Sequence, residues 1–126
     1  MENAKLMVLE EAEKSYNIRH RCFHFAKAVM KFIADCKYER IHFSIFDQLL
    51  RSATSIGANV VEGGSGSTKK DFINFFHIAL KSANETKYWL CLIRDTIQIN
   101  INKLDKLLKE ADELSKIIAA IILKAK

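Results

Sequence analysis

The chain contains no proline, and its four glycines all lie between residues 57 and 66. Proline lacks the backbone N–H that an α-helix needs, and glycine weakens helix interiors, so long helices can form on both sides of this stretch. The abundance of Leu, Ile, Ala, Lys and Glu favours helices as well. With 126 residues, the chain has the length of one domain with a full hydrophobic core. We therefore expect an all-α protein with a tight turn after residue 62.

Apolar residues recur at intervals of three and four along four segments, which predicts four amphipathic helices over roughly 15–37, 45–62, 68–98 and 102–124. This pattern, with short connections, is typical of an antiparallel up-and-down four-helix bundle, here spanning 15–126. Residues 1–14 are expected to be an N-terminal tail or an extension of the first helix. The expected core positions, helix by helix, are Ile18, Cys22, Phe25, Val29, Phe32 and Cys36; Ile45, Leu49, Ala53, Ile56 and Val60; Phe72, Phe76, Ala79, Ala83, Thr86, Leu90, Ile93 and Ile97; and Leu104, Leu107, Ala111, Leu114, Ile118 and Ile121.

Short polar residues mark the predicted helix starts. A hydroxyl or amide followed three residues later by an acidic residue is a typical helix cap. Such pairs precede the second, third and fourth helices: Ser44 with Asp47, Thr68 with Asp71, and Asn102 with Asp105. At the other end of the second helix, Gly63 is expected to stop the helix in the left-handed conformation.

Basic residues exceed acidic residues by 20 to 15, which gives a net charge of +5. This surplus permits binding to RNA, and repetition in a symmetric oligomer would turn it into a strong field. The candidate nucleic-acid contacts lie on a basic line of the first helix and at the start of the third: Arg19, His20, His24, Lys27, Lys31, Lys69 and Lys70. The two histidines lack a third ligand nearby, so no metal site is assigned to them.

A polar face runs along the second helix and continues on the third. Its members are spaced by three and four residues, so they share one side of each helix. They could form a hydrogen-bonded network or a subunit interface, and contact with RNA is the alternative, which the two acidic members would oppose. The candidates are Gln48, Arg51, Ser55, Asn59, Glu62, Ser82 and Glu85.

The third helix carries a second apolar line beside its core stripe. One bundle seam does not need two such lines, so Phe75, Ile78 and Trp89 are candidates for contact with another subunit. The alternative is an ordinary wide core face.

No enzyme, cofactor or metal site is expected. The Gly-Ser-rich segment 63–69 lacks the order GxxxxGK[ST] of a P-loop. Glu62 and Glu85 could form a carboxylate pair, but neither belongs to a Glu-x-x-His motif and no nucleophile completes a site. The three cysteines are far apart in the sequence and odd in number, which favours reduced thiols packed in the core.

A cytoplasmic protein is expected. The N-terminal residues lack the basic and apolar regions of a signal peptide. The longest apolar run, 117–123, is far too short to span a bilayer, so no membrane partner is expected.

The string Gln-Leu-Leu-Arg-Ser-Ala-Thr-Ser-Ile-Gly-Ala-Asn-Val-Val-Glu-Gly at 48–63 closely resembles the signature of a bacterial family. This family comprises the four-helix-bundle proteins named for the intervening sequences of 23S ribosomal RNA genes. Segments 69–72 and 78–90 look like the rest of its pattern, whereas the N-terminal segment and the fourth helix are only generically similar. The resemblance implies a ring, typically a homopentamer, and a role associated with RNA. Related accessory proteins of retroelements partner a reverse transcriptase.

Composition, motifs and resemblance together predict a non-enzymatic, homo-oligomeric and RNA-associated binding module. The alternative is a protein–protein assembly adaptor, such as an accessory subunit for a reverse transcriptase or another nucleic-acid enzyme. The two differ in one observable property, because binding to RNA through lysines weakens steeply with salt and docking of apolar surfaces does not.

Overall fold

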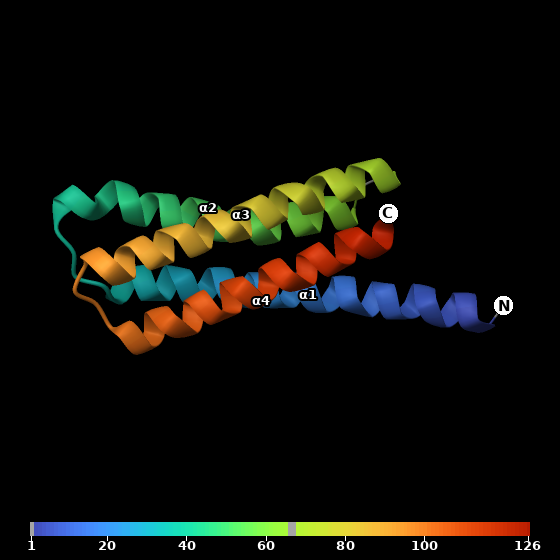
Figure 1. The fold of residues 1–126 in the computed structure, drawn as a ribbon, viewed down its shortest axis with the longest axis horizontal. Helices are drawn as coiled ribbons and strands as arrows, with labels where there is room; N and C mark the ends of the chain where they lie inside the picture. The colour runs from blue at the N-terminus through green and yellow to red at the C-terminus, as the bar shows by residue number, and fades with distance from the viewer. Residues whose placement is uncertain (1, 66–67) are drawn as a thin grey trace.

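The computed structural model describes residues 2–65 and 68–126, with side chains from Asn17 onward. It contains four α-helices, α1 (Glu2–Asp35), α2 (Phe43–Gly64), α3 (Lys69–Thr96) and α4 (Ile101–Ala125), and one 3-10 helix, η1 (Arg40–His42). The expected all-α four-helix bundle is confirmed (Figure 1). Most helix ends lie within two residues of the expected positions, but α1 begins at Glu2 and so includes the segment that precedes residue 15.

Each helix packs against its neighbours in the sequence, and α1 also packs against α4, which closes the bundle. The contact between α2 and α3 is the most extensive. The turn from α2 to α3 lies at the same end of the bundle as the C-terminus, and the other two connections lie at the opposite end (Figure 1). This order is that of an up-and-down bundle.

The core consists of the predicted apolar stripes. Nearly all expected core positions are buried, and the remainder are half-buried side chains that pack against the core: Cys36, Ile45, Phe72, Ile97 and Ile121. On α4 the buried stripe ends at Ile122 instead of Ile121. The helical spacing of apolar residues was therefore sufficient to locate the interior.

The predicted cap of α3 is confirmed, and that of α4 is wrong by two residues. Thr68 Oγ1 accepts a hydrogen bond of 3.0 Å from the backbone N–H of Asp71. For α4 the capping residue is Asn100, whose Oδ1 accepts from the backbone N–H of Lys103 at 3.2 Å. Asn102 is already inside the helix. Asn100 is followed three residues later by Lys103 instead of an acidic residue, so the pattern used for the prediction could not find it.

The predicted cap of α2 by Ser44 is wrong. The helix begins at Phe43, directly after η1, and the residue before it, His42, makes no side-chain capping bond. The 3-10 turn leads straight into the helix, so the first helical N–H groups follow an existing turn. Asp47 instead accepts a hydrogen bond of 3.0 Å from Arg51 Nε one turn later.

The left-handed conformation predicted for Gly63 is also wrong. The helix continues to Gly64, and no glycine that the structure describes has a positive φ. Gly63 is buried, and a Cβ atom there would lie 2.9 Å from Cδ1 of Phe76 and 3.1 Å from Cβ of Phe75. Glycine is therefore needed because α3 approaches closely, and not because the backbone turns.

Replacing Gly63 with alanine should lower the free energy of unfolding by about 1–2 kcal/mol, because overpacking against buried Phe76 outweighs the gain in helix propensity. Gly64→Ala is the matched control, since its Cβ would meet only the guanidinium of Arg19, the movable end of a long side chain. The control should be neutral or stabilising by up to about 1 kcal/mol. Urea titrations followed by helical circular dichroism measure both; equal destabilisation of the two variants would contradict close packing at Gly63.

Candidate functional site

Hydroxyl and amide side chains line the contact between α2 and α3. Thr86 Oγ1 lies 2.9 Å from Ser52 Oγ and 2.7 Å from the backbone oxygen of Ser82. One helical turn away, Ser82 Oγ donates to Ser55 Oγ at 2.9 Å. Asn59 Nδ2 donates to the same Ser55 Oγ at 3.0 Å and to the backbone oxygen of Ser55 at 2.8 Å. These five residues form one hydrogen-bonded network across the two helices, called here the α2–α3 network.

Three of the seven predicted polar-face residues belong to this network: Ser55, Asn59 and Ser82. The other four are exposed and lie outside it: Gln48, Arg51, Glu62 and Glu85. A long or charged side chain on this face can reach water, so it has no need of a partner inside the bundle.

Ser52 and Thr86 are the buried members of the network. The spacing of polar residues along the second helix includes Ser52, and Thr86 was expected in the core stripe of the third helix, but neither was assigned to a network. Thr86 interrupts an otherwise apolar stripe, and Ser52 lies between two polar-face positions on α2. A buried hydroxyl needs a hydrogen-bond partner, so two hydroxyls at core positions of adjacent helices were a signal for a contact between them.

The edge of α3 beside the network carries the predicted apolar interface residues. Phe75 and Trp89 are half-buried, and Ile78 is 45% exposed. Tyr88, which packs edge-on against the indole of Trp89 at 5.0 Å between ring centroids, is 60% exposed. The Nε1 atom of Trp89 is buried, and no residue that the structure describes accepts its hydrogen. This edge therefore exposes apolar side chains at Ile78 and Tyr88, with the exposed Glu85 between Ile78 and Trp89, and it includes one unsatisfied donor.

All seven predicted nucleic-acid contacts are exposed. On α1, the rings of His20 and His24 stack with centroids 5.9 Å apart, and Lys27 and Lys31 continue the same face. Neither lysine takes part in an ion pair with a described residue. The same holds for Arg19, Lys69 and Lys70.

Arg19 lies where α1 meets the C-terminal end of α2. A Cβ atom at Gly64 would lie 2.6 Å from its Nη2 atom, so the guanidinium covers this glycine. Lys69 and Lys70 begin α3 just beyond the following turn. Arg19 therefore lies at the end of the bundle at which α3 begins.

Other basic side chains hold helices together. Arg21 donates from Nε to Glu110 of α4 at 3.1 Å, and its Nη2 pairs with the other carboxylate oxygen. This hydrogen bond raises the pKa of Arg21. Lys87 of α3 reaches Asp112 of α4 at 3.2 Å. The basic residues with such roles face α4, whereas Lys27 and Lys31 on the outer face of α1 make no ion pair with a described residue.

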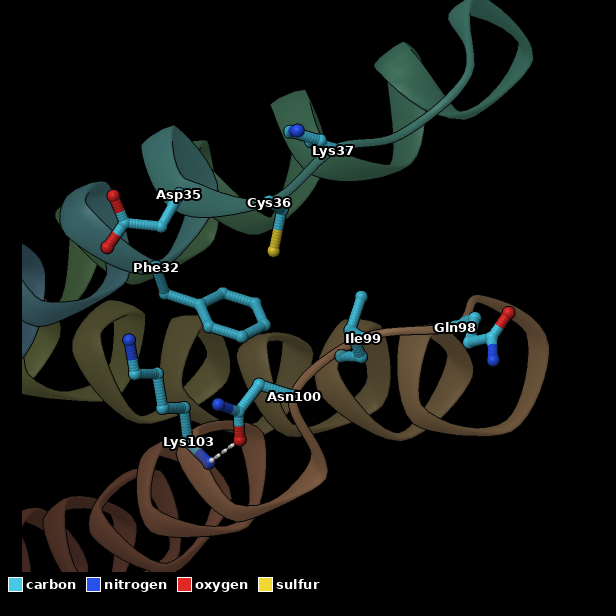
Figure 2. A pocket seen from close by; sticks show the side chains of 8 residues that line it. All are labelled: Phe32, Asp35, Cys36, Lys37, Gln98, Ile99, Asn100 and Lys103. Atoms are coloured by element: carbon cyan, nitrogen blue, oxygen red, sulfur yellow. Dashed lines mark hydrogen bonds between the residues drawn. The ribbon is translucent and has the colours of Figure 1, made fainter.

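A hollow of about 250 Å³ lies at the end of the bundle where the α1–α2 and α3–α4 connections meet (Figure 2). Cys36 Sγ points into it beside Phe32 and Ile99, and the carboxylate of Asp35 lies opposite the amino group of Lys103 (Figure 2). Burial, and then the charge of Asp35, raises the pKa of the Cys36 thiol. A neutral thiol is a poor nucleophile, so Cys36 is not activated for nucleophilic attack.

The other described residues offer few groups for nucleophilic or metal chemistry. Burial raises the pKa of Cys22 to about 12, so this thiol is neutral under physiological conditions. From Asn17 onward, leaving out 66–67, no cluster of three His, Cys, Asp or Glu side chains could hold a metal ion. In the same part of the chain, none of the helices has the length and apolar character needed to cross a membrane.

Replacing Thr86 with valine should lower the free energy of unfolding by about 1–3 kcal/mol, because the shape is kept while the hydroxyl that links Ser52 to Ser82 is lost. The Ser52→Ala variant should behave similarly, and the double variant should lose less than the sum of the two. Urea unfolding of the four proteins in this cycle measures the coupling. Strict additivity would mean that the two hydroxyls do not interact.

Comparisons with a family model and with solved structures agree with the four-helix fold. A family model described as 23S rRNA-intervening sequence protein matches residues 14–120. A solved structure of a protein with unknown function, from the S23 ribosomal protein family of Bacteroides thetaiotaomicron VPI-5482, has a similar fold with a TM-score of 0.77. Its sequence is 36% identical to this chain, and the match covers 86% of this chain and 97% of that one. None of the curated proteins matches. The chain belongs to the family of 23S rRNA-intervening sequence proteins.

Proposed function

We propose that the protein is a non-enzymatic, homo-oligomeric module that binds RNA. The observation that carries this proposal is the exposed basic face of α1, defined by His20, His24, Lys27 and Lys31, whose two lysines make no ion pair with a described residue. The description of the family, which names an intervening sequence of ribosomal RNA, supports the same class of partner.

The charge of this face is available to a phosphate backbone. A lysine that is already paired with a carboxylate gains little binding free energy when it contacts a phosphate. A lysine without such a partner releases counterions from RNA when it binds. Lys27 and Lys31 are one turn apart on α1, about 6 Å along the helix axis, so both can follow one strand. Arg19 and the lysines at the start of α3 extend the basic surface toward the α2–α3 turn.

Assembly is proposed at the outer edge of α3, through Phe75, Ile78 and Trp89. Ile78 and Tyr88 are exposed on this edge, and Tyr88 packs against the half-buried ring of Trp89. A second subunit packed here would remove the apolar surface of Ile78 and Tyr88 from water. A ring of such subunits, with five members expected from the family resemblance, would multiply the net charge of +5 carried by each chain.

A protein–protein adaptor is the second candidate function. It is favoured by the same apolar edge, since exposed Ile78 and Tyr88 could dock a different protein instead of a second copy. No catalytic role is proposed, because Glu62 and Glu85 are exposed outside the α2–α3 network and the thiol of Cys22 is kept neutral by burial.

Changing Lys27 and Lys31 together to glutamine should weaken RNA binding and reduce the slope of log affinity against log salt by about 1.4, or 0.7 for each lost contact with a single strand. The matched control is Lys106→Gln with Lys109→Gln, which removes the same charge from exposed positions on α4. Anisotropy titrations of a labelled, mixed-sequence RNA at several salt concentrations measure both. Indistinguishable curves for the two double variants would remove the α1 face from the proposal.

Changing Ile78 to aspartate should lower the mass in solution toward the 14.4 kDa of one chain, because a buried charge would separate the subunits. Ile41→Asp is the control, since Ile41 is exposed in η1 at the other end of the bundle. Light scattering measures the mass. If the unaltered protein is already a monomer, the proposed assembly is wrong.

A further inference from the structure

A groove of about 350 Å³ lies between α1 and α2, on the side of α2 away from the α2–α3 network. Its lining includes the small residues Ala26, Gly57 and Ala58. A Cβ atom at Gly57 would lie 3.1 Å from Cβ of Cys22, so the glycine allows α1 and α2 to approach closely here. These small side chains make part of the lining apolar and low, beside the branched side chains of Thr54 and Val61.

One wall of the groove is the aromatic ring of Phe23, which is 62% exposed. The Nζ atom of Lys27 lies over this ring, 5.9 Å from its centroid, and the ring of His24 meets it edge-on at 6.0 Å. The exposed aromatic ring is therefore embedded in the basic face of α1. Aromatic rings beside a cationic surface are how proteins bind single-stranded nucleic acids, with the bases stacked and the backbone on the cations.

The polar groups of the groove suit the edge of a base. Arg19 supplies hydrogen-bond donors and Glu62 supplies acceptors. The hydroxyl of Thr54 donates to the backbone oxygen of Leu50 at 2.8 Å, so toward the groove it can only accept. A carboxylate repels phosphate, but it accepts hydrogen bonds from the amino groups of bases. Glu62 therefore opposes a phosphate backbone in the groove and favours a base in it.

We propose that this groove binds one unpaired RNA base, stacked on Phe23, while the adjoining phosphates lie on Lys27 and Lys31. The inference rests on the proposed RNA function and makes it specific, because it names single-stranded RNA as the ligand. In a duplex, neighbouring base pairs cover the faces of each base, so a base cannot enter the groove without being unstacked. The charge around the groove argues for RNA over a symmetric contact with a second copy, which would place the same cations against each other.

The test uses a labelled RNA strand, alone and annealed to its complement, and the variants Phe23→Leu and Phe43→Leu. Leucine keeps the apolar bulk and removes the aromatic face. Phe43 is a matched control because it is also exposed, at 55%, but lies at the start of α2, about 20 Å along the helix from Gly57. Phe23→Leu should weaken binding of the single strand by about 5- to 100-fold, and Phe43→Leu should have no effect.

The outcomes separate the groove from the broader RNA function. If single strand and duplex bind equally and Phe23→Leu has no effect, while the Lys27 and Lys31 double variant still weakens binding, the groove inference is overturned and the RNA function stands. If the unaltered protein binds neither RNA, both are overturned. A fall in solution mass of Phe23→Leu, with its urea unfolding unchanged, would also overturn the inference, because the groove would then be a subunit contact.

Discussion

The close approach of α2 and α3 is the constraint on which the rest of the structure depends. Gly63 leaves room for the ring of Phe76, and Ser52 and Thr86 bring their hydroxyls within 2.9 Å of each other. A buried hydroxyl must keep its partner, so the register of one helix on the other is fixed. This register determines which side chains of α2 and α3 meet, and α4 and α1 pack against the outer sides of the pair.

Two surfaces of different chemistry lie on either side of α2. Toward α3 the outer edge is apolar and contains the unsatisfied indole of Trp89. Toward α1 the surface is basic and aromatic, with Phe23 and Lys27 in contact. The cations that bridge helices, Arg21 and Lys87, are used on the α4 side. Assembly and RNA binding are therefore proposed for surfaces that do not compete, and a ring could present several basic faces to one RNA.

The fold could be predicted from the sequence because the spacing of apolar residues is a local property of each helix. The stripe from Ile18 to Phe32, for example, is buried as its heptad spacing predicted. The role of Gly63 could not be predicted, because it depends on a ring that α3 brings against it. The α2–α3 network was only partly predicted for the same reason: membership depends on the register between two helices, which placed Thr86 opposite Ser52 and left Glu85 exposed.

Photochemical cross-linking of the assembled protein to single-stranded RNA, with the linked peptides identified by mass spectrometry, tests most directly whether RNA meets the α1 face. Direct ultraviolet cross-links form where bases stack on aromatic side chains. We predict linked peptides from residues 19–31 of α1, with Phe23 as the linked residue, and from the start of α3 at lower yield. Cross-links confined to α4 or to the apolar edge around Ile78 and Trp89 would contradict this assignment of the RNA-binding surface.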